Sequence, residues 1–181
     1  MRTLQDFIKH ERVQALTIDR LHTMTIRKNI RFREYSKIKR SDTLRSLLGG
    51  EGALVILWDN EHDPSVGHYT LLFRYGGRLE YFDPYGLTIQ KLCAITQNDP
   101  TKLLHILKGH HYGSNRVAMQ SRREDVNTCG RFCVTRWNFA EFTLKQFYGV
   151  FQYKISRDDL VILFTLPGDF SNWKSVLKDE R

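Results

Sequence analysis

The sequence predicts an α+β fold, in which a small mixed β-sheet packs against helices. Strand-like apolar runs occupy the middle of the chain, at 53–58 and on either side of Gly76-Gly77, whereas helical spacing with capping signals dominates both flanks. The 181 residues are 41% apolar and contain no internal repeat or low-complexity linker. A chain of this size can bury one good core, so we expect a single domain over residues 1–181.

Start and stop signals mark the expected helices. These helices are expected at 4–13, at 41–48, at the KLLHILKG segment after Asp99-Pro100, at 129–145, and over the LVILFTL run after the Ser156 capping pattern. The residues from about 167 onward are expected to form a mobile tail. No apolar run approaches the length of a membrane span, so we expect no membrane partner.

The segment between His68 and Asp83 predicts a β-hairpin whose turn is Gly76-Gly77. Two-residue hairpin turns need positive φ angles, which glycine adopts without steric cost. With this turn, Tyr75 faces Arg78, and continuing the pairing puts His68 and Asp83 on one sheet face. As diagonal neighbours they would lie about 7–8 Å apart at the backbone. A one-residue bulge would separate them, and an exposed histidine with a turn aspartate before a proline is the alternative interpretation.

A cysteine opens the helix expected at 129–145. Its apolar positions recur at helical spacing, at Phe132, Cys133, Trp137, Ala140 and Leu144. Asn127 and Thr128 are suitable N-cap residues, so Cys129 is expected at the helix N-terminus. The unpaired N–H groups there favour an anion, which lowers a thiol pKa and enriches the nucleophilic thiolate. Gly130 is expected to let a substrate backbone approach closely.

The other two cysteines, Cys93 and Cys133, are expected to be ordinary buried thiols. An odd number of cysteines, three, without a secretory signal predicts a reducing compartment and no disulfide framework. A metal site is not expected, because Cys129 and Cys133 lack a matching second pair of ligands.

A histidine, a carboxylate and a cysteine are the parts of an activated thiol nucleophile. Their chain order here is His68, Asp83, Cys129, whereas papain-like enzymes place the cysteine first. With the FDPYG segment at 82–86 and the Cys-Gly helix start, this order resembles the adenovirus maturation protease and the ubiquitin-like-protein-specific (Ulp1-type) cysteine proteases. FDPYG is especially similar to the adenovirus-type protease and its relatives in virophages and Maverick/Polinton elements. The chain departs from the pattern at Tyr69, where a tryptophan is common, and in a slightly short hairpin.

The resemblance implies the Ulp1/adenovirus-protease fold and a thiol-dependent endopeptidase. Its substrates would be viral capsid or other structural precursors, cleaved in the virion and the host cell interior. Cys129 would be the nucleophile, His68 the base and then the acid, and Asp83 the group that orients His68. The resemblance also assigns Gln120 to the oxyanion hole, together with the backbone N–H of Cys129. The charged insert at 122–125 accounts for the slightly long spacing between Gln120 and Cys129.

The basic segment at 27–40 contributes much of the net charge of +8. Its basic side chains are Arg27, Lys28, Arg31, Arg33, Lys37, Lys39 and Arg40. The segment is either a solvated face or a phosphate-binding strip, with Phe32 and Tyr35 stacking on bases or pointing into the core. The adenovirus protease family uses DNA as an activity cofactor, so the resemblance adds DNA as a candidate activator. The sequence itself requires no cofactor.

Three other functions remain as alternatives. An isopeptidase that removes ubiquitin or similar modifiers shares all of this chemistry and differs only in substrate. A YopJ-type acetyltransferase uses a similar triad on acetyl-CoA, but we find no added regulatory region for it. A catalytically idle nucleic-acid-binding protein is disfavoured by the intact triad.

Overall fold

A five-stranded mixed sheet forms the centre of the computed structural model, which describes residues 3–60, 63–123 and 125–166. In chain order its strands are β1 (Ile30–Glu34), β2 (Gly52–Asn60), β3 (Asp63–Tyr75), β4 (Arg78–Phe82) and β5 (Gly113–Ser114). The spatial order is the same; the β1/β2 and β4/β5 pairs are parallel, and the β2/β3 and β3/β4 pairs are antiparallel. The tail expected from residue 167 lies outside the described residues.

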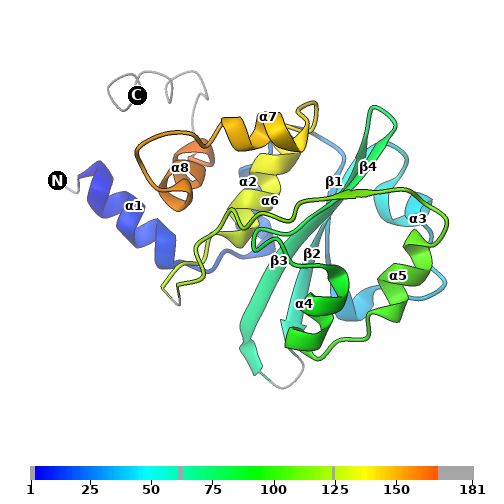
Figure 1. Ribbon diagram of the computed structural model, residues 1–181. Helices are drawn as coiled ribbons and strands as arrows, with labels where there is room; N and C mark the ends of the chain where they lie inside the picture. The colour runs from blue at the N-terminus through cyan, green and yellow to red at the C-terminus, as the bar shows by residue number, and fades with distance from the viewer. Residues whose placement is uncertain (1–2, 61–62, 124, 167–181) are drawn as a thin grey trace.

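Helices cover both faces of this sheet (Figure 1). The helices are α1 (Leu4–Val13), α2 (Ile18–Thr23), the 3₁₀ turn η1 (Tyr35–Lys37), α3 (Leu44–Leu48), α4 (Ile89–Thr96), α5 (Thr101–Leu107), α6 (Cys129–Asn138), α7 (Leu144–Gly149) and α8 (Arg157–Phe164). The predicted α+β class is therefore confirmed. None of the helices in these described segments is long and apolar enough to span a membrane.

Alternation along β2 divides the core into two clusters, one on each sheet face. Ala53 and Val55 face a cluster that includes residues of α2, α6, α7 and α8. Leu54, Ile56 and Trp58 face a second cluster with residues of α3, α4 and α5. The continuous apolar run at 53–58 is explained by this double burial, since a strand covered on both faces has no polar side.

The helix predicted at 129–145 is wrong in its length, because the structure breaks it into α6 and α7. The buried Arg136 donates to the carbonyl of Phe139, the C-cap residue of α6, at 2.7 Å, and to that of Phe142, in the connection to α7, at 2.9 Å. Thr143 then starts α7 with a reciprocal capping box to Gln146. Helical spacing of apolar residues continues across the break, so the pattern does not reveal it.

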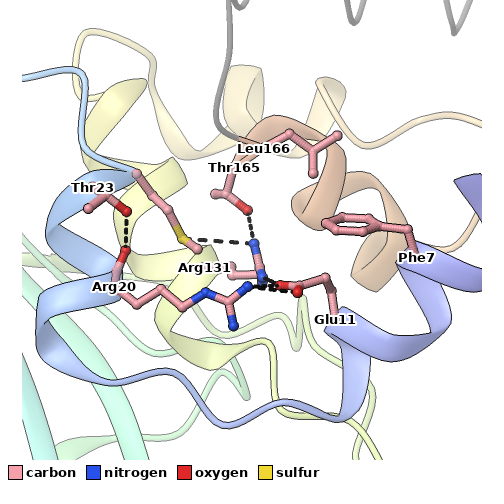
Figure 2. A pocket seen from close by; sticks show the side chains of 8 residues that line it. Phe7, Glu11, Arg20, Thr23, Arg131, Thr165 and Leu166 are labelled. Atoms are coloured by element: carbon pink, nitrogen blue, oxygen red, sulfur yellow. Dashed lines mark hydrogen bonds and ion pairs between the residues drawn. The ribbon is translucent and has the colours of Figure 1, made fainter.

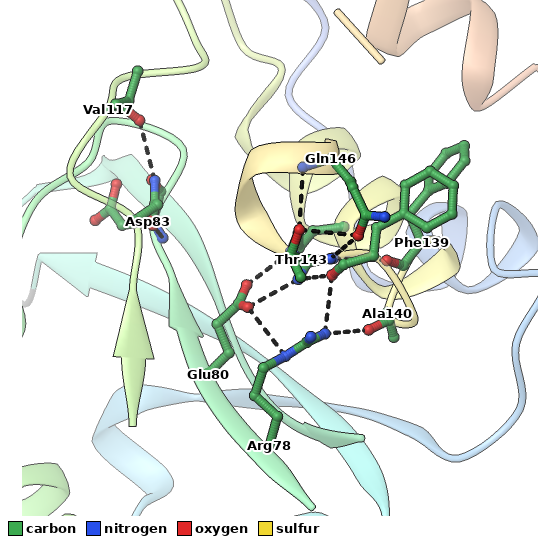
Figure 3. Close-up of polar contacts among 11 residues, drawn as sticks. Arg78, Glu80, Asp83, Val117, Phe139, Ala140, Thr143 and Gln146 are labelled. Carbon is green, nitrogen blue, oxygen red and sulfur yellow. Dashed lines mark hydrogen bonds and ion pairs between the residues drawn. The ribbon is translucent and has the colours of Figure 1, made fainter. Parts of the chain in front are cut away.

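A buried ion pair joins β4, which directly precedes Asp83, to α6, which begins at Cys129. Arg136 of α6 donates to both carboxylate oxygens of Glu80 in β4, at 2.7 and 2.8 Å, and neither side chain is exposed. Arg78 adds bonds from β4 to the carbonyls of Ala140 and Phe142 (Figure 3). Breaking such a buried pair costs about 3–5 kcal/mol. It therefore holds α6 in a defined register against the sheet.

The N-terminal helices are tied to α6 by a second charged cluster, shown in Figure 2. Glu11 of α1 accepts hydrogen bonds from Arg20 of α2 and from the buried Arg131 of α6. The guanidinium of Arg131 also donates to Thr165, at 2.6 Å. These residues line a small cavity of about 150 Å³ that the predicted catalytic residues do not reach.

Candidate active site

His68 lies on β3 where that strand extends beyond the end of β4. The observed pairing runs from Tyr75 opposite Arg78 to Leu71 opposite Phe82 without a bulge, which confirms the predicted hairpin register. The pairing shift near this site falls instead between β2 and β3, at Asp59/Asn60. Nε2 of His68 lies 3.2 Å from Oδ1 of Asp83, and the two side chains are 9% and 0% exposed.

Asp83 is held through one oxygen of its carboxylate and through its backbone. The amide N–H of Tyr85 donates to the same Oδ1, at 2.6 Å, in a turn closed by the side chain. The buried side chain of Asn115 accepts from the Asp83 N–H at 2.8 Å and donates to the Asp83 carbonyl at 2.6 Å. Asn115 comes directly after β5, which pairs with β4. Its side chain thus adds contacts to the chain just beyond the last backbone pair of these two strands. The sequence analysis missed Asn115, because no local pattern distinguishes it.

Cys129 begins α6, as predicted, and its side chain is half-buried. Burial raises the pKa of the Cys129 thiol, but hydrogen bonding and the charge of His68 outweigh it, helped by the N–H groups of Tyr69 and Gly130. The resulting pKa is lower than that of an ordinary thiol. No side chain caps α6, because the Thr128 hydroxyl bonds elsewhere. This corrects the predicted capping role of Thr128.

His68 and Cys129 each shift the pKa of the other. Burial alone lowers the pKa of His68, yet bonds and charges from Asp83 and Cys129 raise that pKa to about 10. Because Asp83 takes Nε2, the other ring nitrogen is left for the sulfur. A raised histidine pKa beside a lowered thiol pKa favours a thiolate–imidazolium pair at neutral pH. That pair is the reactive form of a cysteine nucleophile.

Cys93 and Cys133 differ sharply from Cys129. Both are buried, and burial raises the pKa of Cys93 to about 11 and that of Cys133 well above the usual thiol value. Burial confirms the expectation that they are core thiols. In the part of the chain that the structure describes, no three His, Cys, Asp or Glu side chains gather as metal ligands would.

Gln120 is connected to the site through Tyr85. Its amide nitrogen donates to the Val126 carbonyl at 3.0 Å and to the Tyr85 hydroxyl at 3.2 Å. The Tyr85 ring stacks on the His68 ring, with centroids 4.7 Å apart. To act in an oxyanion hole, the Gln120 side chain must donate one amide proton to the substrate oxygen. The bond to the Tyr85 hydroxyl is the longer of the two, so we expect the substrate to replace that one. The assignment of Gln120 remains a prediction.

Gly130 has a packing role in the structure, and its predicted role in substrate approach stays a prediction. It is buried, and a Cβ there would come within 2.8 Å of Leu21 and 3.2 Å of the Tyr69 ring. The glycine therefore lets α2 and β3 pack directly against the start of α6. Tyr69, in turn, donates its hydroxyl to the Leu16 carbonyl at 3.0 Å.

If this site cleaves peptide bonds, its pH optimum should be broad, because His68 and Cys129 titrate as a pair. Activity rises as Cys129 loses its proton, below the ordinary thiol pKa, and falls only as His68 loses its proton at about pH 10. The rate of Cys129 alkylation by iodoacetamide reports the acid limb, and kcat/KM against pH reports both limbs. An alkaline limb near 6.5, the ordinary histidine value, would contradict the ion pair.

The basic segment makes fewer cations available than its sequence suggests. Several of its side chains bond within the protein: Arg27 to Glu141, Arg31 to the Ser46 carbonyl, Arg33 to Asp42 and Lys37 to Glu34. Lys28, Lys39 and Arg40 are exposed and form no ion pair with the carboxylates of the described residues. Tyr35 is buried and stacks on Trp58, so it lies in the core and is not open to a base.

If the basic segment binds DNA, these three exposed cations should make the main phosphate contacts. Replacing Lys28, Lys39 and Arg40 with alanine should then flatten the plot of log affinity against log salt, by up to about 0.9 for each phosphate that is no longer neutralised. Fluorescence anisotropy with unrelated duplexes measures this slope. Lys9, Lys108 and Lys154, also exposed, form a control triple of equal charge. The same slope in both triples would mean that the basic segment is an ordinary solvated face.

These features define an α+β protein with a buried His–Asp pair facing a cysteine at a helix start. No protein-family model matches the chain. It is similar to the "Uncharacterized protein V9" of Sputnik virophage, at 28% identity over 148 residues, which cover 73% of this chain and 83% of the relative. This similarity indicates a virophage-related origin.

Proposed function

We propose that this protein is a cysteine endopeptidase that cleaves structural precursor proteins during the assembly of a virophage-like particle. One observation carries the proposal. His68 interacts with both Asp83 and Cys129, which come from separate segments of the chain. In this arrangement the pKa of His68 is raised and that of Cys129 is lowered. Perturbed pKa values of paired groups are typical of catalytic sites. Similarity to a virophage protein supports the viral setting.

The chemistry follows from the pair. The thiolate of Cys129 attacks the scissile carbonyl carbon, and the backbone N–H of Cys129 with Gln120 stabilises the oxygen that becomes negative. The imidazolium of His68 gives its proton to the leaving amine, which departs and leaves a thioester on Cys129. A water then attacks the thioester while His68 removes its proton, and the free thiolate re-forms. Asp83 keeps the His68 ring oriented and stabilises its charged form.

Mass spectrometry of cleavage products tests this proposal. The wild-type protein and Cys129→Ala would each be incubated with virophage capsid precursor proteins and, separately, with ubiquitin-like conjugates. We expect new N-termini in the precursors with the wild-type protein alone. Products from the conjugates only would identify an isopeptidase, and no product from either would refute the peptidase function.

A further inference from the structure

Asp158, at the start of α8, contacts both ends of the loop 121–128. Its Oδ1 accepts a hydrogen bond from the Thr128 hydroxyl at 2.5 Å, and its Oδ2 accepts one from the Ser121 N–H at 3.1 Å. The residue is 5% exposed, and burial raises the pKa of its carboxyl group. A carboxylate in such a place is costly unless its oxygens are bonded, and here both accept from the loop.

Capping of α8 does not account for this carboxylate. The side chain of Ser156 caps α8 by accepting from the Asp159 N–H at 3.1 Å. The neighbouring Asp159 pairs with Arg12 and points to a different partner. Of the two acidic residues at the start of α8, Asp158 is thus the one that binds the loop 121–128.

The loop ends are the positions that matter for acyl transfer. Ser121 directly follows Gln120, the predicted oxyanion donor, and Thr128 directly precedes Cys129. On its other side, Gln120 is held by its N–H bond to the Pro84 carbonyl, at 3.0 Å. One carboxylate thus links the residue after the oxyanion donor to the residue before the nucleophile.

We propose that Asp158 is a positioning residue that sets the distance between Gln120 and Cys129, and so forms the oxyanion hole without touching the substrate. The proposal rests on the proposed function through the roles of Gln120 and Cys129. It deepens that function by explaining how the two ends of the loop that carries the charged insert at 122–125 are held together. It also explains why the Thr128 hydroxyl does not cap α6.

The test compares two reactions of Cys129. Acylation by p-nitrophenyl acetate forms a thioester and releases p-nitrophenolate, and it passes through an oxyanion that needs the hole. Alkylation by iodoacetamide forms a thioether and releases iodide, and it needs only the thiolate. Asp158→Asn removes the charge and leaves one acceptor oxygen in place of two, so at least one of the two loop donors loses its charged acceptor. We expect the looser loop to slow acylation by about 10²-fold. Alkylation, including its pH dependence, should stay as in the wild-type protein.

Matched variants separate positioning from folding. Thr128→Val removes the hydroxyl at similar size and should slow acylation as Asp158→Asn does. Thr128→Ser keeps the hydroxyl and should be acylated at nearly the wild-type rate. Asp125→Asn makes the same chemical change at an exposed position of the loop, where Asp125 pairs with Arg123, and should leave both reactions unchanged. If Asp158→Asn fails to fold, the two Thr128 variants decide the question.

Each result has a definite meaning. Unchanged acylation in Asp158→Asn and Thr128→Val, or equal slowing of acylation and alkylation, would overturn the proposal. A wild-type protein that is not acylated at Cys129 would overturn it as well. Acylation that depends on Asp158 without cleavage of any precursor would refute the processing function and support the positioning role.

Discussion

Cys129→Ala should reduce cleavage to background, a loss of up to about 10⁶-fold by analogy with nucleophile removal in other acyl-transfer enzymes. The expectation follows from the contrast among the thiols: the pKa of Cys129 is lowered, whereas those of Cys93 and Cys133 are raised by burial. No other thiol of the chain can replace it. The measurement is kcat/KM for a precursor peptide that the wild-type protein cuts.

Two controls show that the loss is chemical. The side chain of Cys129 is half-buried and small, so Cys129→Ala should unfold at nearly the wild-type temperature. Cys93→Ala should retain full activity, because Cys93 lies in the second core cluster and not at the site. Brief iodoacetamide treatment of the native protein should label Cys129 first. Equal labelling of all three cysteines would contradict the assignment.

Local signals in the sequence were sufficient for the hairpin and for the helix start at Cys129. Gly76-Gly77 determines the turn, and both glycines have positive φ, at 55° and 74°. Because a two-residue turn sets the register of everything that follows it, counting along the strands was enough to bring His68 and Asp83 together. The helix start at Cys129 was also predictable, because Thr128 ahead of it and the apolar spacing after it lie within a few residues.

Non-local bonds account for what the sequence analysis missed. The break between α6 and α7 depends on Arg136, whose position relative to Glu80 and the Phe139 carbonyl is known only once β4 and α6 are packed. Asn115 and Asp158 are similar cases, because each reaches a segment distant in the chain. Polar residues of this kind show no periodicity, and a single sequence does not distinguish them from ordinary surface positions.

The structure also shows contacts of the basic segment that its composition does not reveal. Charge density alone suggested a strip of free cations, but part of the segment is an edge strand whose arginines satisfy neighbouring groups. Arg31 binds the Ser46 carbonyl in α3, and Arg33 pairs with Asp42. Arginine has several donors in a planar fork, so it often serves such internal contacts. Composition alone therefore does not show which of these cations also have partners within the protein.

Asp83→Asn should lower kcat by about 10⁴-fold while leaving the fold intact. The substitution keeps the size of the side chain and the backbone contacts with Asn115, at 2.6 and 2.8 Å. It removes the charge that raises the pKa of His68, so that this pKa should fall from about 10 toward its ordinary value of 6.5. The imidazolium would then lose its proton at neutral pH, and the thiolate of Cys129 would lose its partner.

The pH profile distinguishes this mechanism from general damage. In Asp83→Asn the alkaline limb of kcat/KM should move to lower pH, and alkylation of Cys129 at neutral pH should slow. Asp42→Asn, the same change at a half-buried carboxylate that pairs with Arg33 and not with His68, should leave both unchanged. Asp83→Glu should retain part of the activity, because a carboxylate remains within reach of His68. Full activity in Asp83→Ala would show that another group orients His68, and the triad would have to be reassigned.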